Sequence, residues 1–147
     1  MAASPRKSPR TTVAAEDYLE KIEQLIARKG YARVVDIAAE LKIAQASVTA
    51  MVQKLDASGF VKYEKYRGMV LTRTGLEVAR RIAHRHALLT DFLRAIGVAD
   101  EKVIYDDVEG MEHHISPESF KAIEHLTRHL EQNPTIMARA VAAKNDK

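Results

Sequence analysis

"ARVVDIAAELKIAQASVTAMVQKLDASGFVKYEKYRGMVLT", residues 32–72, is the stretch that decides the fold. Its apolar residues recur at helical spacing over 34–41 and again over 45–57, and only three residues separate the two runs. A glycine ends the second run, and the residues after it alternate around a turn at 65–68, which is typical of a hairpin. The pattern predicts a helix-turn-helix followed by a two-stranded wing.

The two predicted helices divide their side chains between a packed side and an open side. The residues expected to hold the helices together are Ile37, Leu41, Ile43, Val48, Val52 and Leu55. The open side is small, polar and mildly basic, which suits the major groove of DNA, where amides and hydroxyls meet base edges and lysines meet phosphates. The residues expected to contact DNA are Gln45, Ser47, Thr49, Ala50, Gln53 and Lys54 on the second helix, with Lys65 and Arg67 at the wing tip.

Outside this stretch, apolar residues at steps of three and four predict further helices, so the expected fold class is mainly α. One of these helices has two possible starts, because Thr74 has Glu77 three residues later, the spacing of a capping box, while Thr72 is also a suitable cap. The helices expected there run from Ala14 to a stop at Gly30, from Thr72 or Thr74 to a stop at Gly97, through Glu109 to His114, onward from Ser116-Pro117, and onward from Pro134.

Composition divides the 147 residues into three expected parts. Residues 1–13 are rich in Ser, Pro, Arg and Lys without an apolar period, which predicts a disordered basic arm. Residues 14–75 contain the winged helix-turn-helix, and residues 76–147 are expected to form an all-helical domain. Residues 1–75 hold 13 Lys/Arg and 8 Asp/Glu, whereas residues 76–147 hold 10 and 12 together with all six histidines. A basic portion suits a polyanion, and a portion rich in acids and imidazoles suits a cation.

"EGMEHH", residues 109–114, packs two carboxylates and two imidazoles into six positions. In a helix, Glu109, Glu112 and His113 would share one face, where they could hold a divalent cation, serve as acid and base in an enzyme, or simply be solvated. Cysteine is absent, which excludes disulfides and thiolate ligands, so any metal must be bound by Asp, Glu, His or main-chain oxygen.

In their order along the chain, these parts resemble the DtxR family of metal-dependent bacterial repressors, in particular its manganese branch. The stretches that carry the resemblance extend over about residues 14–119, and they are "EDYLEKI", "KGYARVVDIA", "SVTAMVQKL", "YEKYRGMVLT", "HRHALLTDFLRAIGV" and "DVEGMEHHIS". The resemblance implies a manganese-responsive regulator, not an enzyme, that binds operator DNA as a metal-activated dimer and represses metal-uptake genes. It also implies that residues 76–147 are the metal-binding and dimerisation domain. The metal ligands that it implies are Asp17, Glu20, His86, Glu109, Glu112 and His113.

The resemblance also implies the cofactor and the partners. Two Mn²⁺ ions per chain are expected, for which Fe²⁺, Co²⁺, Cd²⁺ or Zn²⁺ can substitute, and the partners are double-stranded operator DNA and a second copy of the chain in a homodimer. No small organic substrate is expected. Affinity of such ligands rises from Mn²⁺ toward Cu²⁺, so a preference for manganese would rest on coordination geometry and metal supply. Three alternatives stay open: a repressor that senses iron or zinc, a regulator with an organic or protein signal, and a dinuclear metal-dependent hydrolase.

Three further expectations concern the molecule as a whole. No apolar run approaches the length of a membrane span and no signal peptide is evident, so a cytoplasmic protein is expected. The apolar rows contain none of the implied ligands except His86, so the chain is expected to fold without metal. A last apolar row suits either a dimer surface or an internal core, and it consists of Phe120, Ile123, Leu126 and Leu130.

Overall fold

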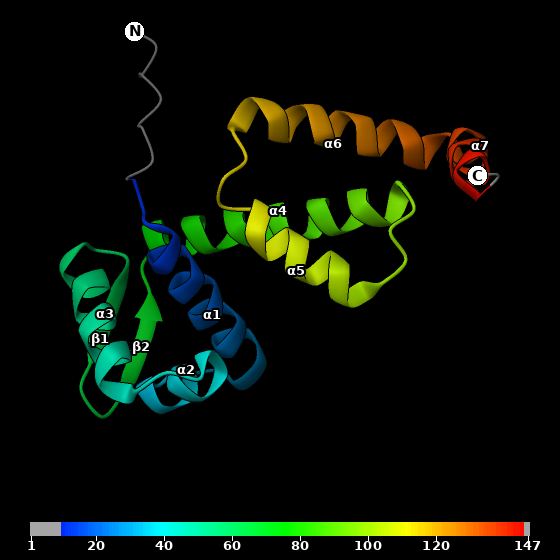
Figure 1. Cartoon of the computed structure of the whole chain (residues 1–147). Helices are drawn as coiled ribbons and strands as arrows, with labels where there is room; N and C mark the ends of the chain where they lie inside the picture. Colours follow the sequence, from blue (N-terminus) through cyan, green and yellow to red (C-terminus); the bar gives the residue numbers. More distant parts are fainter. Residues whose placement is uncertain (1–9, 146–147) are drawn as a thin grey trace, which may run out of the picture. The chain divides into compact units, whose positions relative to one another are not determined.

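The computed structural model describes residues 10–145, which fold into helices and one two-stranded antiparallel sheet (Figure 1). The mainly α fold class is therefore confirmed. Residues 1–9, most of the expected basic arm, lie outside the described residues, and Val13 at its end is already helical. The elements are α1 (Val13–Lys29), α2 (Val34–Leu41), α3 (Gln45–Ala57), β1 (Val61–Glu64), β2 (Gly68–Leu71), α4 (Arg73–Ala95), α5 (Glu101–Met111), α6 (Pro117–Gln132) and α7 (Pro134–Asn145).

The chain divides into two compact units, with the division between Arg80 and Arg81 inside α4. The first unit has its own core, formed by α1, α2, α3, the sheet and the start of α4. The second unit has a separate core around Leu89, Leu93, Ile104 and Val108. None of the helices in the described part of the chain is long and apolar enough to cross a membrane.

The helix-turn-helix of the first unit has the predicted helix ranges. Lys42 ends α2 in a left-handed conformation with a φ of 56°, and its amide donates to the carbonyl of Ala38. The predicted contacts between the helices are buried at Ile37, Val48, Val52 and Leu55. The prediction was wrong for Ile43, which is 39% exposed because it lies in the turn, outside the packed face of either helix.

The wing follows directly after α3. Its strands pair from Val61 opposite Leu71 to Glu64 opposite Gly68, and the amide of Met69 donates to the carbonyl of Ala32 at 3.0 Å. Gly68 has a φ of 103°, and a Cβ there would lie 2.5 Å from that same carbonyl oxygen. The close approach of residue 32 to the wing therefore requires a glycine at position 68.

Helix α4 begins at the first of its two predicted starts. The Oγ1 atom of Thr72 accepts from the amide of Gly75 at 3.1 Å and donates to the carbonyl of Gly59 at 2.7 Å. The alternative capping box of Thr74 and Glu77 is not formed, because Thr74 lies inside the helix and Glu77 pairs with Arg73 at 3.0 Å. The hydroxyl of Thr72 thus caps α4 and also ties it to the end of α3.

In the second unit, α5 is shorter at its carboxyl end than the sequence predicted. The helix ends at Met111, so Glu112 is its C-cap and His113 and His114 lie in the turn that follows. In the turn, the amides of His114 and Ile115 both donate to the carbonyl of Met111, at 3.0 and 3.1 Å, and the carbonyl of Glu112 accepts from the Arg85 side chain at 2.9 Å. Ser116 then caps α6, accepting from the amide of Ser119 at 3.1 Å.

Candidate metal centre and DNA-binding surface

A cluster of acids and histidines connects α4 with the end of α5 in the second unit. The Nδ1 atom of His86 lies 2.9 Å from Oε2 of Glu112 and 3.4 Å from Oε1 of Glu109. One ligand atom from each of these three residues lies within 4.8 Å of the others. The Nε2 atom of His113 lies 3.3 Å from Oε1 of Glu112. The structure thus brings four of the implied ligands together within one unit.

Glu112 is the most unusual member of this cluster because its residue is 0% exposed. Its Oε2 atom is bonded to His86, but Oε1 has no hydrogen-bond partner among the described residues. His113 approaches Oε1 to within ion-pair distance, yet the geometry does not make a hydrogen bond. A buried carboxylate oxygen without a hydrogen bond is costly, and a bound cation is one way to remove that cost. Glu112 is thus a wholly buried candidate ligand that the apolar rows of the sequence did not contain, and the expectation that the chain folds without metal stays a prediction.

Arg85 holds Glu112 from the main-chain side. Its Nη1 atom donates to the carbonyl of Glu112 at 2.9 Å, and its guanidinium carbon lies 5.5 Å from the centroid of the Phe120 ring on α6. Neighbouring residues of α4 therefore bind both ends of Glu112, Arg85 the carbonyl and His86 the carboxylate. Arg85 was not among the predicted site residues, and no local pattern points to it, because Arg85 and Glu112 are 27 positions apart.

The donor set fits a hard or borderline divalent cation. Carboxylate oxygens and imidazole nitrogens are suitable ligands for Mn²⁺, Fe²⁺ and Zn²⁺, and no sulfur atom belongs to the cluster. The cluster brings two carboxylates close together, so a bound cation would relieve the repulsion between Glu109 and Glu112. His86, Glu109, Glu112 and His113 are the residues of this unit that could hold such an ion.

Asp17 and Glu20, the other implied ligands, belong to α1 in the first unit. Both side chains are partly buried, and they lie three residues apart, on the same side of the helix. Their role as metal ligands stays a prediction.

The predicted DNA-binding residues lie on α3 and at the wing tip of the first unit. Gln45, Ser47, Ala50, Gln53 and Lys54 are exposed, and so are Lys65 and Arg67. Thr49 is half-buried, and its hydroxyl donates to the carbonyl of Gln45 at 3.0 Å, so its remaining capacity is as an acceptor. Arg67 pairs with Glu64 at 3.3 Å, which partly neutralises its charge. Their contact with DNA stays a prediction.

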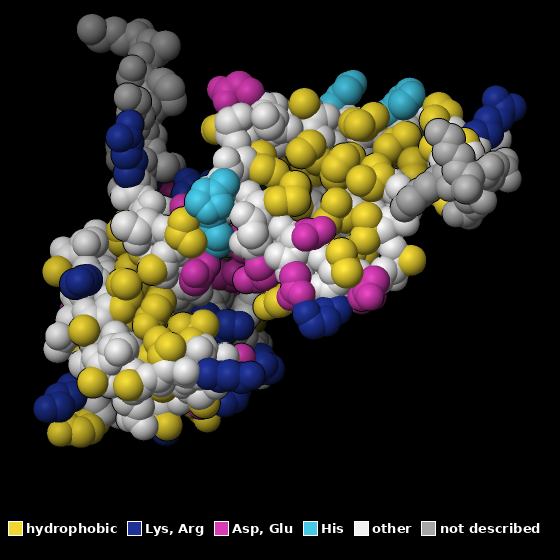
Figure 2. Space-filling view, viewed as in Figure 1, with side chains coloured by type: hydrophobic (Ala, Val, Ile, Leu, Met, Phe, Trp, Pro, Cys, Tyr) yellow, Lys and Arg dark blue, Asp and Glu magenta, His cyan; other side chains and the backbone are white. Residues whose placement is uncertain are grey.

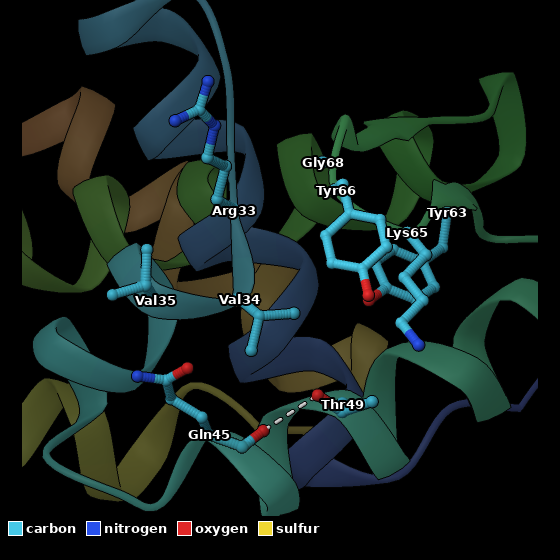
Figure 3. Close-up of a pocket in the computed structure, with 9 residues that line it drawn as sticks. All are labelled: Arg33, Val34, Val35, Gln45, Thr49, Tyr63, Lys65, Tyr66 and Gly68. Carbon is cyan, nitrogen blue, oxygen red and sulfur yellow. Dashed lines mark hydrogen bonds between the residues drawn. The ribbon is translucent and has the colours of Figure 1, made fainter.

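A hollow of about 350 Å³ lies between α3 and the wing (Figure 3). Three of the predicted DNA-binding residues line it, namely Gln45, Thr49 and Lys65. The other lining residues were not predicted, and they are Arg33, Val34, Val35, Tyr63, Tyr66 and Gly68. A signal for Tyr66 was available, since it is an aromatic residue between two basic residues in a predicted turn.

Comparison with known proteins places both units in one family. Residues 10–69 match the family described as "Iron dependent repressor, N-terminal DNA binding domain". Residues 72–138 match the family described as "Iron dependent repressor, metal binding and dimerisation domain". The chain therefore belongs to the iron-dependent repressor family, which confirms the resemblance to the DtxR family of metal-dependent repressors.

Individual relatives agree with this assignment. The chain is 52% identical over 133 residues to the HTH-type transcriptional regulator MntR of Lysinibacillus sphaericus, a match that covers 90% of this chain and 95% of the relative. It is 53% identical over 123 residues to the protein of the same name from Bacillus subtilis, which covers 84% and 86% of the two chains. The solved structure of the manganese regulator SloR is 26% identical with a TM-score of 0.69, covering 78% of this chain and 53% of that one.

These relatives establish the class of the protein. A DNA-binding domain followed by a metal-binding and dimerisation domain makes the chain a metal-dependent transcriptional regulator and not an enzyme. The chain spans about half of the SloR chain and nearly the whole length of the curated relatives.

Proposed function

We propose that this protein is a manganese-responsive repressor that binds operator DNA as a metal-activated homodimer and controls metal-uptake genes. The observation that carries the proposal is the buried Glu112 carboxylate, which has an oxygen without a hydrogen bond beside His86 and Glu109, in a chain with a DNA-binding domain. The similarity to relatives named MntR and to the manganese regulator SloR supports manganese as the signal.

The proposed ligands are the six residues implied by the family. His86, Glu109, Glu112 and His113 belong to the second unit, whereas Asp17 and Glu20 belong to the DNA-binding unit. Metal binding by all six would therefore connect the occupancy of the site to the state of the winged helix. Four carboxylates and two imidazoles are enough donors for two ions, and Fe²⁺, Co²⁺, Cd²⁺ and Zn²⁺ are the expected substitutes.

The proposed partner besides DNA is a second copy of the chain. In Figure 2 hydrophobic side chains gather over the helices of the second unit. Leu126 on α6 is 45% exposed and Ile136 on α7 is 46% exposed, whereas Leu130 is buried and Ile123 packs against the core. The apolar row of α6 thus contributes partly to the internal core and partly to the surface. The exposed part suits the dimer contact that the domain description names.

The test is the affinity for DNA from upstream of a candidate manganese-uptake gene, measured by fluorescence anisotropy at one salt concentration. Salt is held fixed because phosphate contacts alone change the affinity strongly. We expect weak binding in chelator and a gain of at least about tenfold in Mn²⁺, within the range of typical coupling free energies. Parallel titrations with anaerobic Fe²⁺ and with Zn²⁺ compare the metals. Equal operator affinity in chelator and in Mn²⁺ would reject the proposal.

A further inference from the structure

The hollow between α3 and the wing offers polar groups from both of its sides. Gln45 and Thr49 come from α3, whereas Tyr63, Lys65 and Tyr66 come from the wing. In Figure 3 the hydroxyl groups of the two tyrosines and the amine of Lys65 are directed toward the α3 side. Lys65 supplies a cationic group to the hollow, whereas the guanidinium of Arg33, which also lines it, is turned away and lies 4.8 Å from the centroid of the Tyr31 ring. None of the nine lining residues is acidic. The charge of the hollow therefore suits an anionic partner.

Tyr66 occupies a backbone position that a tyrosine rarely adopts. The amide of Arg67 donates to the carbonyl of Glu64 at 3.0 Å, which closes a β-turn with Tyr66 as its third residue. Tyr66 has a φ of 70°, in the left-handed region, where glycine or asparagine is normally found at that position of a turn. The choice of tyrosine thus adds strain to the wing tip.

Packing within the unit does not offset that strain. Tyr66 is 89% exposed, so its ring buries very little surface. The ring is approached by the neighbouring Lys65, whose Nζ atom lies 5.2 Å from the centroid, a contact that is weak at an exposed site. A strained and exposed aromatic residue at the rim of a cationic hollow therefore points to a role in binding.

We propose that the hollow receives the sugar-phosphate backbone of the operator beside the groove bound by α3, and that Tyr66 contacts it directly. The ring would pack against a deoxyribose, the hydroxyl would donate to a phosphate oxygen, and Lys65 would neutralise the same stretch of backbone. The inference rests on the proposed function for its DNA partner, but it concerns a contact that is independent of metal. Backbone contacts position a protein without reading sequence, so Tyr66 would add affinity for every DNA sequence alike.

Tyr66→Asn in the full-length protein tests the proposal, because asparagine tolerates the left-handed turn position. We expect an unchanged or higher Tm and a loss of about tenfold in affinity for operator DNA and for unrelated DNA, measured in saturating Mn²⁺. Tyr66→Phe removes only the hydroxyl and should lose a smaller part of the affinity. The ratio between affinities in Mn²⁺ and in chelator should equal that of the parent.

The contribution of Lys65 to DNA binding can be tested against Lys62 as a control. Both are exposed lysines of the same hairpin, but Lys62 lines a different hollow, with Tyr31 and Val70. Lys65→Ala should lower the slope of log affinity against log salt by about 0.9, the value for one lost phosphate contact. Lys62→Ala should leave the slope unchanged.

Three results would overturn the inference. They are parental affinity in Tyr66→Asn, a loss confined to the specific operator, and a fall in Tm that accounts for the loss. If the DNA affinity of the parent protein were the same with and without Mn²⁺, the proposed function would be rejected. The comparison of Tyr66 variants would still test the backbone contact.

Discussion

At the scale of single residues, Glu112 determines the chemistry of the second unit. Its carboxylate is wholly buried, its Oε2 atom meets His86, and its Oε1 atom lacks a hydrogen bond among the described residues. Removing a carboxylate from water costs roughly several kcal/mol, as for other buried ions. A bound cation or hydrogen bonds can offset this cost. If Glu112 is a metal ligand, as we propose, its position lowers the stability of the metal-free protein and raises the affinity for metal.

Glu112→Gln should separate these two properties. Glutamine keeps the shape and removes the buried negative charge, so the Tm in chelator should be unchanged or higher. The parent should gain about 2.7 kcal/mol of stability when free Mn²⁺ is about 100 times its Kd, whereas the variant should gain almost nothing. Thermal unfolding with and without Mn²⁺ measures both effects, with the exposed Glu118→Gln as the control. A parental response to Mn²⁺ in Glu112→Gln would exclude this residue as a ligand.

Arg85→Ala should destabilise the second unit. It leaves the carbonyl of Glu112 without its 2.9 Å donor and removes the contact with Phe120, at a cost of about 1–3 kcal/mol. Urea unfolding measures the loss, and Arg80→Ala is the control, because Arg80 is an exposed arginine of the same helix. An equal free energy of unfolding for the two variants would show that the hydrogen bond from Arg85 to the carbonyl of Glu112 does not stabilise the unit.

The sequence predicts residue types better than it predicts their surroundings. It pointed to Glu109, Glu112 and His113 because acids and histidines are dense there, yet the burial of Glu112 was not foreseen. Its partners Arg85 and His86 lie 27 and 26 positions away on α4, and no local pattern encodes such contacts. The position of Tyr66 between two basic residues of a predicted turn was visible in the sequence, but its left-handed conformation was not, because the geometry of the turn sets it and not the preference of tyrosine.

At the scale of elements, α2 and α3 were predictable because apolar spacing and turn residues agree with each other. The end of α5 was not, since helical spacing continues through Glu112 and His113 while the backbone stops at Met111. The start of α4 was ambiguous because two threonines fit a cap. Contacts of Thr72 with the end of α3 distinguish them, and these contacts exist only in the folded unit.

Two glycines in helices should respond to alanine in opposite directions. A Cβ at Gly75 in α4 would lie 1.9 Å from the carbonyl oxygen of Phe60, so Gly75→Ala must displace α4 from the end of α3 and destabilise the first unit. Gly110 in α5 has nothing within 4 Å of its Cβ position, so Gly110→Ala should stabilise by about 0.5–1 kcal/mol. Calorimetric unfolding of both variants tests this contrast, and destabilisation by Gly110→Ala would contradict it.

The connection between α4 and α5 should be sensitive to acid. Hydrogen bonds from Arg94 hold the pKa of Glu101 below its ordinary value. A lowered pKa in the folded state means that the ion pair contributes above the ordinary pKa of a glutamate and is lost as the pH falls through the folded value. NMR titration of the Glu101 carboxyl carbon should show the lowered pKa in the parent and its return toward the ordinary value in Arg94→Gln. An identical titration in both proteins would contradict the pairing.

At the scale of the whole molecule, the proposed function links metal binding to DNA binding. One unit carries the winged helix, and the other carries the buried cluster around Glu112. The order of these parts could be predicted from the sequence, because the two functional stretches follow each other as in the family. The coupling between them could not, because it depends on a difference in free energy between two states of the chain.

Because coupling between two ligands is reciprocal, it can also be measured as a change in the affinity for Mn²⁺. If Mn²⁺ raises the affinity for the operator by some factor, the operator must raise the affinity for Mn²⁺ by the same factor. The direct test is therefore an electron paramagnetic resonance titration of Mn²⁺ into the free protein and into its operator complex at the same salt concentration. We expect Mn²⁺ to bind more tightly in the complex, by the same factor by which Mn²⁺ raises the affinity for the operator in the anisotropy experiment. Equal Mn²⁺ affinity with and without operator would contradict the claim that the metal activates DNA binding.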